Sequence, residues 1–318
     1  MKNVLVLLPI EERHKARLDA AGEGCRFTYS TRAAATKEQI QSADIILGCA
    51  PPAKIAASEK LEWLQLDSAG ADAYVKPGVL HAKTLLTNAT GAYTKAVAEH
   101  AFALTLMLQK KLHLYRDDQR RCVWGDHGMS STLSSATVAV IGLGDIGQYY
   151  AKLVKALGAR VIGVKRRASD PPDCVDELVV TSELDSVLPR ADVILSVLPG
   201  TPATTRLYTA ERFAAMKDSA IFINCGRGSA VAMDVLYQAI ASHQIAAAAI
   251  DVAETEPLPP DSPLWGLDDL VITPHVAGNY HLPDILERVV DISAENLRAY
   301  LKGEPLRNMV DFSTGYKK

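Results

Sequence analysis

From residue 138 the sequence reads Val138-Ala139-Val140-Ile141-Gly142-Leu143-Gly144-Asp145-Ile146-Gly147. An apolar strand leads into glycines at the spacing G-x-G-x-x-G, and a helical pattern continues to Leu157. This order of strand, glycine turn and helix is typical of sites that hold the pyrophosphate of a dinucleotide at a helix N-terminus. The stretch therefore predicts a Rossmann-type βαβ unit, in preference to a glycine-rich turn without a ligand. The predicted cofactor contacts in this loop are Gly142, Gly144, Asp145, Ile146 and Gly147.

The end of the next predicted strand indicates which dinucleotide is bound. An NAD site usually has an acidic residue about 20 residues after the motif begins, where it takes the ribose hydroxyls. This sequence has Lys165, Arg166 and Arg167 there instead. Cations at this position suit the 2′-phosphate of NADP, so NADPH is the favoured cofactor and NAD is the alternative. The other interpretation of these residues is a solvated basic loop.

Short apolar runs alternate with helical stretches along the whole chain, which indicates βα units in parallel sheets. The length of 318 residues suits two domains of this kind. The strands predicted before the joining helix are residues 4–8, 27–29, 44–48, 61–66 and 84–87. Those predicted after it are residues 138–142, 160–165, 192–198, 220–224, 246–252 and 270–273.

Residues 95–115 join the two series of strands. Residues 96–108 are apolar nearly all round, so a helix there must be buried inside the molecule or against a second copy of the chain. The last long helical pattern, residues 283–302, is expected to return to the first domain and make that domain discontinuous.

The composition excludes several classes of protein. The net charge of −3 offers no general attraction for nucleic acid or for an anionic membrane. The 5 cysteines are scattered, without a CxxC pair or a Cys/His cluster, so neither a disulfide framework nor a metal site is predicted. The first apolar run is too short for a signal peptide, and no run reaches the length that spans a membrane. We expect a cytoplasmic protein.

Charged and titratable residues follow three predicted strands of the second series, at the edge where open parallel sheets bind ligands. Arg227 follows the strand at 220–224, and His275 follows Thr273-Pro274 after the last strand. Glu254 and Glu256 both follow the strand at 246–252. The spacing from Asp251 and the proline at 257 favour Glu256 as the functional carboxylate.

Together with the glycine motif, these segments resemble the D-isomer-specific 2-hydroxyacid dehydrogenase family, and the glyoxylate/hydroxypyruvate reductases look most similar. The resemblance covers essentially the whole chain, including Ala98-Glu99-His100 and the loop at residues 67–72. It implies an α/β fold of two Rossmann-like domains with parallel sheets, a cleft between them that holds the active site, and a homodimer built around the helix at 96–108. The expected substrate domain is residues 1–98, completed by 283–318, and the expected dinucleotide-binding domain is residues 99–282.

The resemblance also implies roles for single residues. Arg227 would grip the substrate through paired hydrogen bonds from its guanidinium. His275 would give a proton to the carbonyl oxygen as hydride arrives at carbon, and Glu256 would hold the imidazole ring and favour its charged form. The expected substrate contacts are Ser68, Ala69, Gly70, Arg227 and His275. The remaining expected cofactor contacts are Leu198, Pro199, Cys225, Gly226, Asp251, His275 and Gly278.

We therefore expect an enzyme that reduces a small 2-keto acid, similar to glyoxylate or hydroxypyruvate, to the D-2-hydroxy acid with NADPH. One alternative is an NADH-dependent reductase of D-lactate or branched-chain type. The other is a non-catalytic, dinucleotide-sensing protein similar to a corepressor. The lack of an extension after Lys318 argues against the regulated form of phosphoglycerate dehydrogenase, and Glu256 argues against formate dehydrogenase. Asn279-Tyr280 stands where small residues and threonine are more usual, which leaves the substrate size open.

Overall fold

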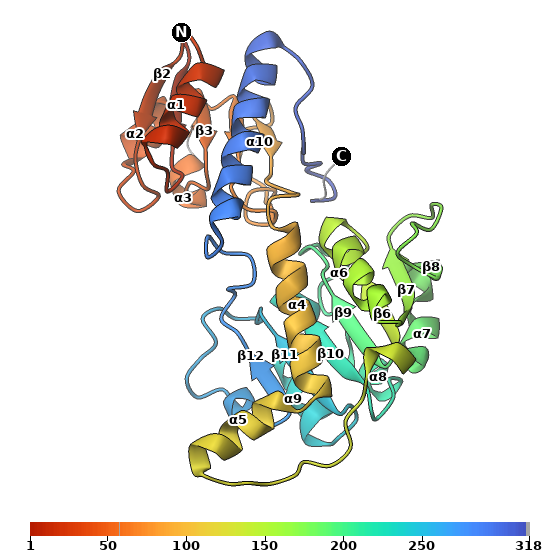
Figure 1. The fold of residues 1–318 in the computed structure, drawn as a ribbon. Helices are drawn as coiled ribbons and strands as arrows, with labels where there is room; N and C mark the ends of the chain where they lie inside the picture. Colours follow the sequence, from red (N-terminus) through yellow and green to blue (C-terminus); the bar gives the residue numbers. More distant parts are fainter. Residues whose placement is uncertain (57, 316–318) are drawn as a thin grey trace. The chain divides into compact units, whose positions relative to one another are not determined.

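The computed structural model describes residues 1–56 and 58–315, which form two compact units (Figure 1). Unit 1 consists of Met1–Tyr93 and Tyr280–Lys318, and unit 2 consists of Thr94–Asn279. The chain therefore passes between the units twice. None of the described helices is long and apolar enough to cross a membrane.

Unit 1 contains a parallel sheet in the order β2-β1-β3-β4-β5. Its central strands consist mainly of buried apolar residues, as expected for a sheet that is covered on both faces. The strands are β1 (Asn3–Val6), β2 (Arg26–Tyr29), β3 (Ile45–Leu47), β4 (Trp63–Gln65) and β5 (Leu85–Thr87). The helices are α1 (Glu12–Ala21), α2 (Lys37–Ser42), α3 (Pro52–Ile55) and α10 (Pro283–Lys302).

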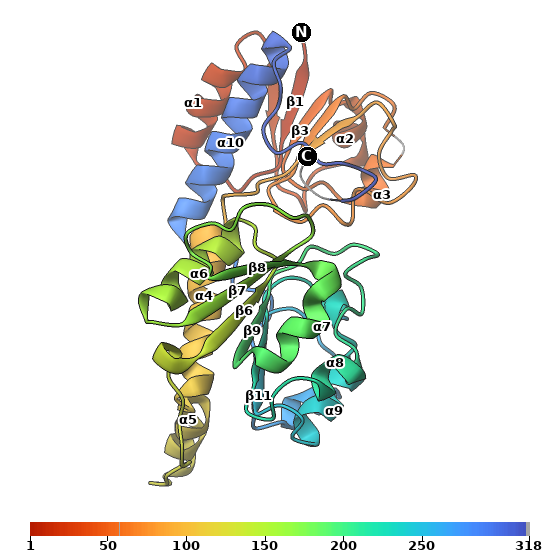
Figure 2. The same cartoon turned by 90° about the vertical axis from the view of Figure 1, so that its right-hand side faces the viewer.

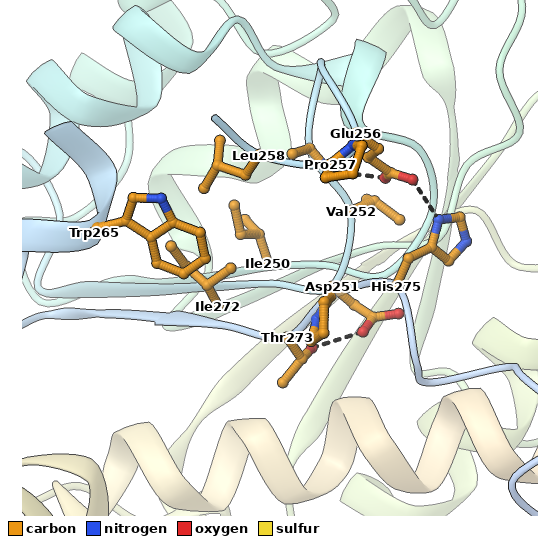
Figure 3. Close-up of a pocket in the computed structure, with 12 residues that line it drawn as sticks. Ile250, Asp251, Val252, Glu256, Pro257, Leu258, Trp265, Ile272, Thr273 and His275 are labelled. Carbon is orange, nitrogen blue, oxygen red and sulfur yellow. Dashed lines mark hydrogen bonds and ion pairs between the residues drawn. The ribbon is translucent and has the colours of Figure 1, made fainter. Parts of the chain in front are cut away.

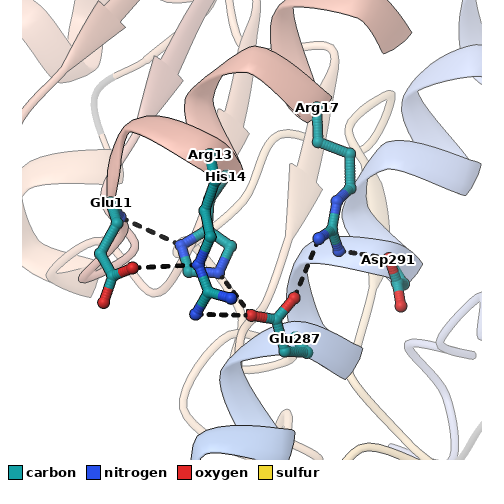
Figure 4. A network of polar contacts seen from close by, with 6 residues as sticks. All are labelled: Glu11, Arg13, His14, Arg17, Glu287 and Asp291. Carbon is teal, nitrogen blue, oxygen red and sulfur yellow. Dashed lines mark hydrogen bonds and ion pairs between the residues drawn. The ribbon is translucent and has the colours of Figure 1, made fainter.

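Helix α10 lies against α1, and a buried histidine connects the two helices (Figure 4). The backbone N–H of Glu11 donates to Nδ1 of His14 over 3.0 Å, so the ring proton is on Nε2. This Nε2 donates to Glu287 on α10 over 2.9 Å, and Arg17 donates to the other oxygen of Glu287 over the same distance. His14 is fully buried, so Glu287 provides the acceptor that its ring requires.

Unit 2 contains a parallel sheet in the order β12-β11-β10-β9-β6-β7-β8. The order reverses beside β6, which is the switch point where doubly wound sheets bind ligands. The strands are β6 (Thr137–Ile141), β7 (Arg160–Lys165), β8 (Glu177–Val180), β9 (Val193–Ser196), β10 (Ile221–Asn224), β11 (Ala247–Ile250) and β12 (Leu270–Ile272).

Helices cover both faces of this sheet. Figure 2 shows α4 and α6 on one face and α7, α8 and α9 on the other. The helices of this unit are α4 (Thr94–Gln109), α5 (Leu112–Arg121), α6 (Asp145–Ala156), α7 (Leu184–Val187), α8 (Ala210–Ala214) and α9 (Met233–Ala241). A sheet covered in this way is buried on both faces, which explains why its strands are continuous apolar runs in the sequence.

The predicted α/β fold with two parallel sheets is confirmed, and each predicted strand region contains a strand, usually with shorter ends. One strand differs from the prediction. The sequence did not predict β8, whose residues are all half-buried at the edge of the sheet. The helix expected at 96–108 is observed as α4, and the rest of the joining segment belongs to a second helix, α5, which begins after Lys111 takes a left-handed φ of 54°.

We predict that Glu287→Ala destabilises unit 1. The change leaves the buried Nε2–H of His14 without its acceptor, which costs about 1–3 kcal/mol. The hydrogen bonds from His14 and Arg17 hold the pKa of Glu287 below its ordinary value. Its contribution is therefore fully present at neutral pH and is lost as the pH falls through that lowered pKa.

Urea unfolding followed by tryptophan fluorescence tests this prediction. Trp63 is completely buried in unit 1, whereas Trp124 and Trp265 are exposed, so the signal change reports mainly on unit 1. Glu295→Ala is the matched control on α10, because Glu295 forms an exposed pair with Arg307 and its loss should cost about 0.5 kcal/mol or less. Equal losses in the two variants would contradict the role of Glu287.

Candidate active site

In the turn between β6 and α6, each of the three glycines is explained by a different feature of its surroundings. Gly142 has a φ of 104°, and a Cβ atom there would lie 2.8 Å from the carbonyl oxygen of Val197. A Cβ at Gly147 would lie 2.3 Å from the carbonyl oxygen of Gly142. Gly144 is the N-cap of α6, and a Cβ there would meet no described atom within 4 Å. The first and third glycines are thus required by the protein, and the second leaves open space at the helix N-terminus.

This open space fits a dinucleotide. The N-terminus of α6 presents backbone N–H groups and the positive end of the helix dipole, which suit a pyrophosphate. Ile141 pairs with Val164 in the sheet, so Lys165 ends β7 directly beside the turn. The Lys165 Nζ donates to Ser169 over 3.1 Å within an exposed loop. The residues present therefore fit a dinucleotide with negatively charged groups at both places.

We predict that two alanine substitutions in this turn affect different properties, one NADPH binding and the other stability. Gly144→Ala should leave the urea midpoint unchanged and weaken NADPH binding about tenfold or more, because a methyl group then occupies the approach to the pyrophosphate. Gly147→Ala should destabilise unit 2 by about 1–3 kcal/mol, because its methyl group overlaps the backbone at Gly142. Fluorescence titration with NADPH measures the affinity, and urea unfolding followed by circular dichroism measures the stability of unit 2. Unchanged NADPH affinity in Gly144→Ala would contradict the assignment of this turn.

His275 and Glu256 form a hydrogen-bonded pair at the carboxyl edge of the same sheet (Figure 3). The His275 Nδ1 lies 2.8 Å from Glu256 Oε2, and the other oxygen of Glu256 accepts from the backbone N–H of Ala253 over 3.0 Å. Half of the His275 side chain is exposed. Within the part of the chain that the structure describes, the Nε2 of His275 has no protein partner. The glutamate thus fixes one ring nitrogen and leaves the other accessible.

The turn that carries His275 is held by a buried aspartate at the end of β11. Asp251 is 2% exposed, and its carboxylate accepts hydrogen bonds from the Thr273 hydroxyl at 2.6 Å and from the N–H groups of Val276 and Ala277 at 3.0 and 3.1 Å. Its carbonyl oxygen accepts from the N–H of His275 at 2.7 Å. These bonds stabilise the left-handed φ of 52° at His275, a conformation that is unfavourable for a residue with a side chain.

His100 also takes part in holding this turn, a role that the sequence did not indicate. Its Nε2 lies 3.0 Å from the Thr273 hydroxyl oxygen, and the Thr273 hydroxyl itself donates to Asp251. His100 therefore donates to Thr273 and orients the hydroxyl toward the carboxylate. A histidine near the start of the joining helix was the available signal, but its partner lies 173 positions away in the sequence.

Arg227 lies in the turn after β10, beside the loop that contains Glu256. The buried Asn224 accepts from the N–H of Gly226 at 3.1 Å and donates to the carbonyl oxygen of Arg227 at 3.0 Å, so one side chain holds both sides of the turn. A Cβ atom at Gly228 would lie 1.9 Å from the carbonyl oxygen of Ala253. This close approach brings the β10 and β11 loops together. Because β10, β11 and β12 are neighbours, Arg227, Glu256 and His275 share one edge of the sheet.

The other predicted cofactor residues of unit 2 follow strands at this same edge. Leu198 and Pro199 follow β9, and a Cβ atom at Gly226 would lie 2.6 Å from the backbone of Leu198. Cys225 is buried, and burial raises the pKa of its thiol, so it is not a thiolate nucleophile. Gly278 lies in a turn three residues after His275. The described residues include no group of three or more His, Cys, Asp or Glu that would hold a metal ion.

An apolar hollow of about 400 Å³ lies beside the histidine–glutamate pair, and the sequence analysis did not anticipate it (Figure 3). Glu256 and His275 are at its polar end and Trp265 is at the opposite end. The remaining apolar side chains around it are Ile250, Val252, Ala253, Pro257, Leu258, Ile272 and Pro274.

In the unit 1 loop at residues 67–71, the carbonyl groups accept hydrogen bonds, whereas the amide groups of residues 68–71 bind no acceptor among the residues that the structure describes. The N–H of Ala89 donates to the carbonyl oxygen of Ser68 at 2.9 Å, and the Asn88 side chain donates to that of Ala69 at 2.8 Å. The Ser68 hydroxyl donates to the carbonyl oxygen of Gly70 at 2.7 Å. Among the described residues, no acceptor is bound by the amide N–H groups of Ser68, Ala69, Gly70 and Ala71. Such a run of free donors is suited to an anion.

The glycine turn, the free imidazole nitrogen and the arginine at one sheet edge define a dinucleotide-dependent oxidoreductase. A sequence profile described as "D-isomer specific 2-hydroxyacid dehydrogenase, NAD binding domain" matches residues 102–277. The chain therefore belongs to the D-isomer-specific 2-hydroxyacid dehydrogenase family, and the resemblance noted in the sequence is confirmed.

Solved structures with the same fold cover nearly the whole chain. A D-isomer specific 2-hydroxyacid dehydrogenase family protein from Aeromonas salmonicida is 33% identical, with a TM-score of 0.85 over 98% of this chain and 99% of that chain. An NADPH-dependent glyoxylate/hydroxypyruvate reductase from Sinorhizobium meliloti, in complex with NADP and sulfate, is 25% identical, with a TM-score of 0.84 over 99% of this chain and 100% of that chain.

Two curated relatives have different substrates in their names. D-3-phosphoglycerate dehydrogenase from Archaeoglobus fulgidus is 36% identical over 71% of this chain, but the match spans only 43% of that protein's length. Glyoxylate reductase from Thermofilum pendens is 31% identical over 78% of this chain and 74% of its own length. The family of this chain is thus established, and the substrates in the names of its relatives differ.

Proposed function

We propose that this protein reduces a small 2-keto acid, of the glyoxylate or hydroxypyruvate kind, to the D-2-hydroxy acid with NADPH. The observation that carries the proposal is the 2.8 Å contact between His275 Nδ1 and Glu256 Oε2, which leaves Nε2 accessible. The reductases from Sinorhizobium meliloti and Thermofilum pendens support this substrate class through their names. The family also supports the proposal that the protein acts as a homodimer.

The pair assigns the proton to one nitrogen. Glu256 accepts the Nδ1–H, so the charged ring carries its other proton on Nε2, the exposed nitrogen. A bound nicotinamide would supply the hydride that the carbonyl carbon of the keto acid accepts. His275 gives its Nε2 proton to the carbonyl oxygen in the same reaction, and Glu256 holds the ring in the orientation that presents this proton. Reversal of these transfers oxidises the hydroxy acid.

Arg227 and the loop at 68–71 are the proposed carboxylate ligands. A guanidinium forms two parallel hydrogen bonds with a carboxylate, which fixes the orientation of the substrate as well as its position. The unpaired amide groups of the unit 1 loop are further donors for the same kind of group. Asp251, in contrast, uses both carboxylate oxygens on the turn of His275, so we propose that it positions the histidine in addition to lying near the cofactor.

We predict that Arg227→Lys lowers kcat/KM for glyoxylate and hydroxypyruvate by about 100-fold or more, because lysine cannot make the paired contact. The dissociation constant of NADPH should stay near that of the wild type. Arg206→Lys is the matched control, because Arg206 is an exposed arginine of the same unit with only a 3.4 Å contact to Glu254. Its activity should be unchanged.

Steady-state kinetics with a panel of 2-keto acids measures this effect and also tests the proposed function. Normal turnover by Arg227→Lys would remove Arg227 from the substrate site. A wild type that binds NADPH tightly but reduces none of the acids would favour a dinucleotide sensor over an enzyme.

The cofactor preference generates a second prediction. The 2′-phosphate of NADP adds about two negative charges, which Lys165 and its neighbours attract. We expect a higher kcat/KM with NADPH than with NADH, and a weaker NADPH interaction at high salt. Lys165→Asp combined with Arg166→Ala should reverse or flatten this preference, mainly through the KM for NADPH. Lys152→Asp, which makes the same change of charge on an exposed residue of α6, is the control. A wild type that prefers NADH at low salt would contradict this interpretation of the basic loop.

A further inference from the structure

The chain crosses between the units at Tyr93–Thr94 and at Asn279–Tyr280, and a tyrosine stands on the unit 1 side of each crossing. Both tyrosines donate hydrogen bonds to the same residue, Asp67, although Tyr280 is 213 positions away from it in the sequence. Asp67 is the first residue of the loop whose amide groups are the proposed carboxylate ligands. The connections between the units are therefore tied to the proposed substrate-binding loop.

The contacts of Asp67 fix both its backbone and its side chain. The Tyr93 hydroxyl donates to its carbonyl oxygen. The Tyr280 hydroxyl donates to Oδ2 at 2.7 Å, and the N–H of Cys49 donates to Oδ1 at 2.8 Å. Three segments that are distant in the sequence thus hold this one residue. Burial raises the pKa of both phenols, and the carboxylate of Asp67 raises it further, so both hydroxyls keep their protons and remain donors.

Peptide geometry transmits this restraint to the amide groups. A peptide unit is planar and trans, so the carbonyl of one residue and the N–H of the next point in opposite directions. When the Tyr93 hydroxyl holds the Asp67 carbonyl, it also sets the direction of the Ser68 N–H. In the same way, the contacts to the carbonyls of Ser68, Ala69 and Gly70 set the directions of the N–H groups that follow them.

We propose that Tyr93 and Tyr280 are positioning residues, which hold Asp67 so that the amide groups of residues 68–71 are preorganised for the substrate carboxylate. This inference rests on the proposed function of that loop. The tyrosines touch neither substrate nor cofactor in this scheme. They act by reducing the conformational freedom that the loop would lose on binding the anion.

Tyr93→Phe and Tyr280→Phe test the proposal, because each removes one hydroxyl and keeps the ring. We expect KM for the keto acid to rise by about five- to tenfold, since each change removes a hydrogen bond of ordinary strength. The same rise is expected in the dissociation constant of oxalate, a planar dicarboxylate that the enzyme cannot reduce. The kcat and the dissociation constant of NADPH should change less than about twofold, because hydride transfer and cofactor binding do not use these hydroxyls.

Tyr300→Phe is the matched control. Tyr300 lies in the same unit, stacks on Trp63 and donates to the Glu62 carboxylate, but it does not contact the loop. It should lower the urea midpoint by a similar amount and leave the KM and oxalate binding unchanged. Equal changes of KM in all three variants would mean that the tyrosines only stabilise unit 1, and would overturn the proposal.

Oxalate binding separates this proposal from the proposed function. If the wild type binds oxalate but reduces no keto acid, the proposed function fails. The positioning role of the tyrosines then stands if Tyr280→Phe weakens oxalate binding and fails if it does not. If the wild type is active and Tyr280→Phe keeps its KM and its oxalate affinity, positioning fails and the function stands. A wild type that shows neither activity nor oxalate binding contradicts both.

Discussion

A buried carboxylate organises the edge of unit 2 on which the proposed chemistry depends. Asp251 is almost inaccessible to water, and a buried charge is costly unless hydrogen bonds replace its hydration. The replacements come from the turn after β12, in the form of one hydroxyl and two backbone amides. The turn must therefore fold back toward β11, and His275 is placed at the point where it does so. His100 completes the arrangement from α4 by orienting the Thr273 hydroxyl.

The two units prepare their polar groups by a related principle. In unit 2 the side chains of Glu256 and Asn224 form hydrogen bonds with the backbone of the turns, and the Nε2 of His275 remains accessible. In unit 1 the loop at 67–71 has its acceptors occupied by Tyr93, Asn88 and Ala89, and its donors remain available. In both places, hydrogen bonds within the protein fix some of the polar groups, and the neighbouring polar groups remain accessible to a ligand. Such groups need little rearrangement on binding, which is the basis of electrostatic preorganisation.

The sequence predicted those features of the protein that are determined by residues close together along the chain. The apolar runs indicated the strands, and Arg227, Glu256 and His275 were predicted because they lie after three of these strands, in segments that resemble a known family. It did not predict β8, whose apolar run is limited to Leu178, Val179 and Val180. The contacts of His100 with Thr273 and of Tyr280 with Asp67 were equally invisible, since they join positions that only the folded chain brings together. The apolar hollow beside Trp265 also depends on the packing of separate loops.

The contact between α1 and α10 has a consequence for the order in which the molecule is made. Unit 2 is continuous, so its core is complete once Asn279 has been synthesised. Unit 1 has its sheet at the beginning of this sequence but must wait for α10, which supplies buried residues such as Val289 and Leu297 and the acceptor for His14. Domains fold as units during synthesis. The emerging sheet of unit 1 therefore stays unfinished on the ribosome while the other unit folds, and a chain that stalls before α10 leaves the apolar face of α1 uncovered, as a substrate for chaperones.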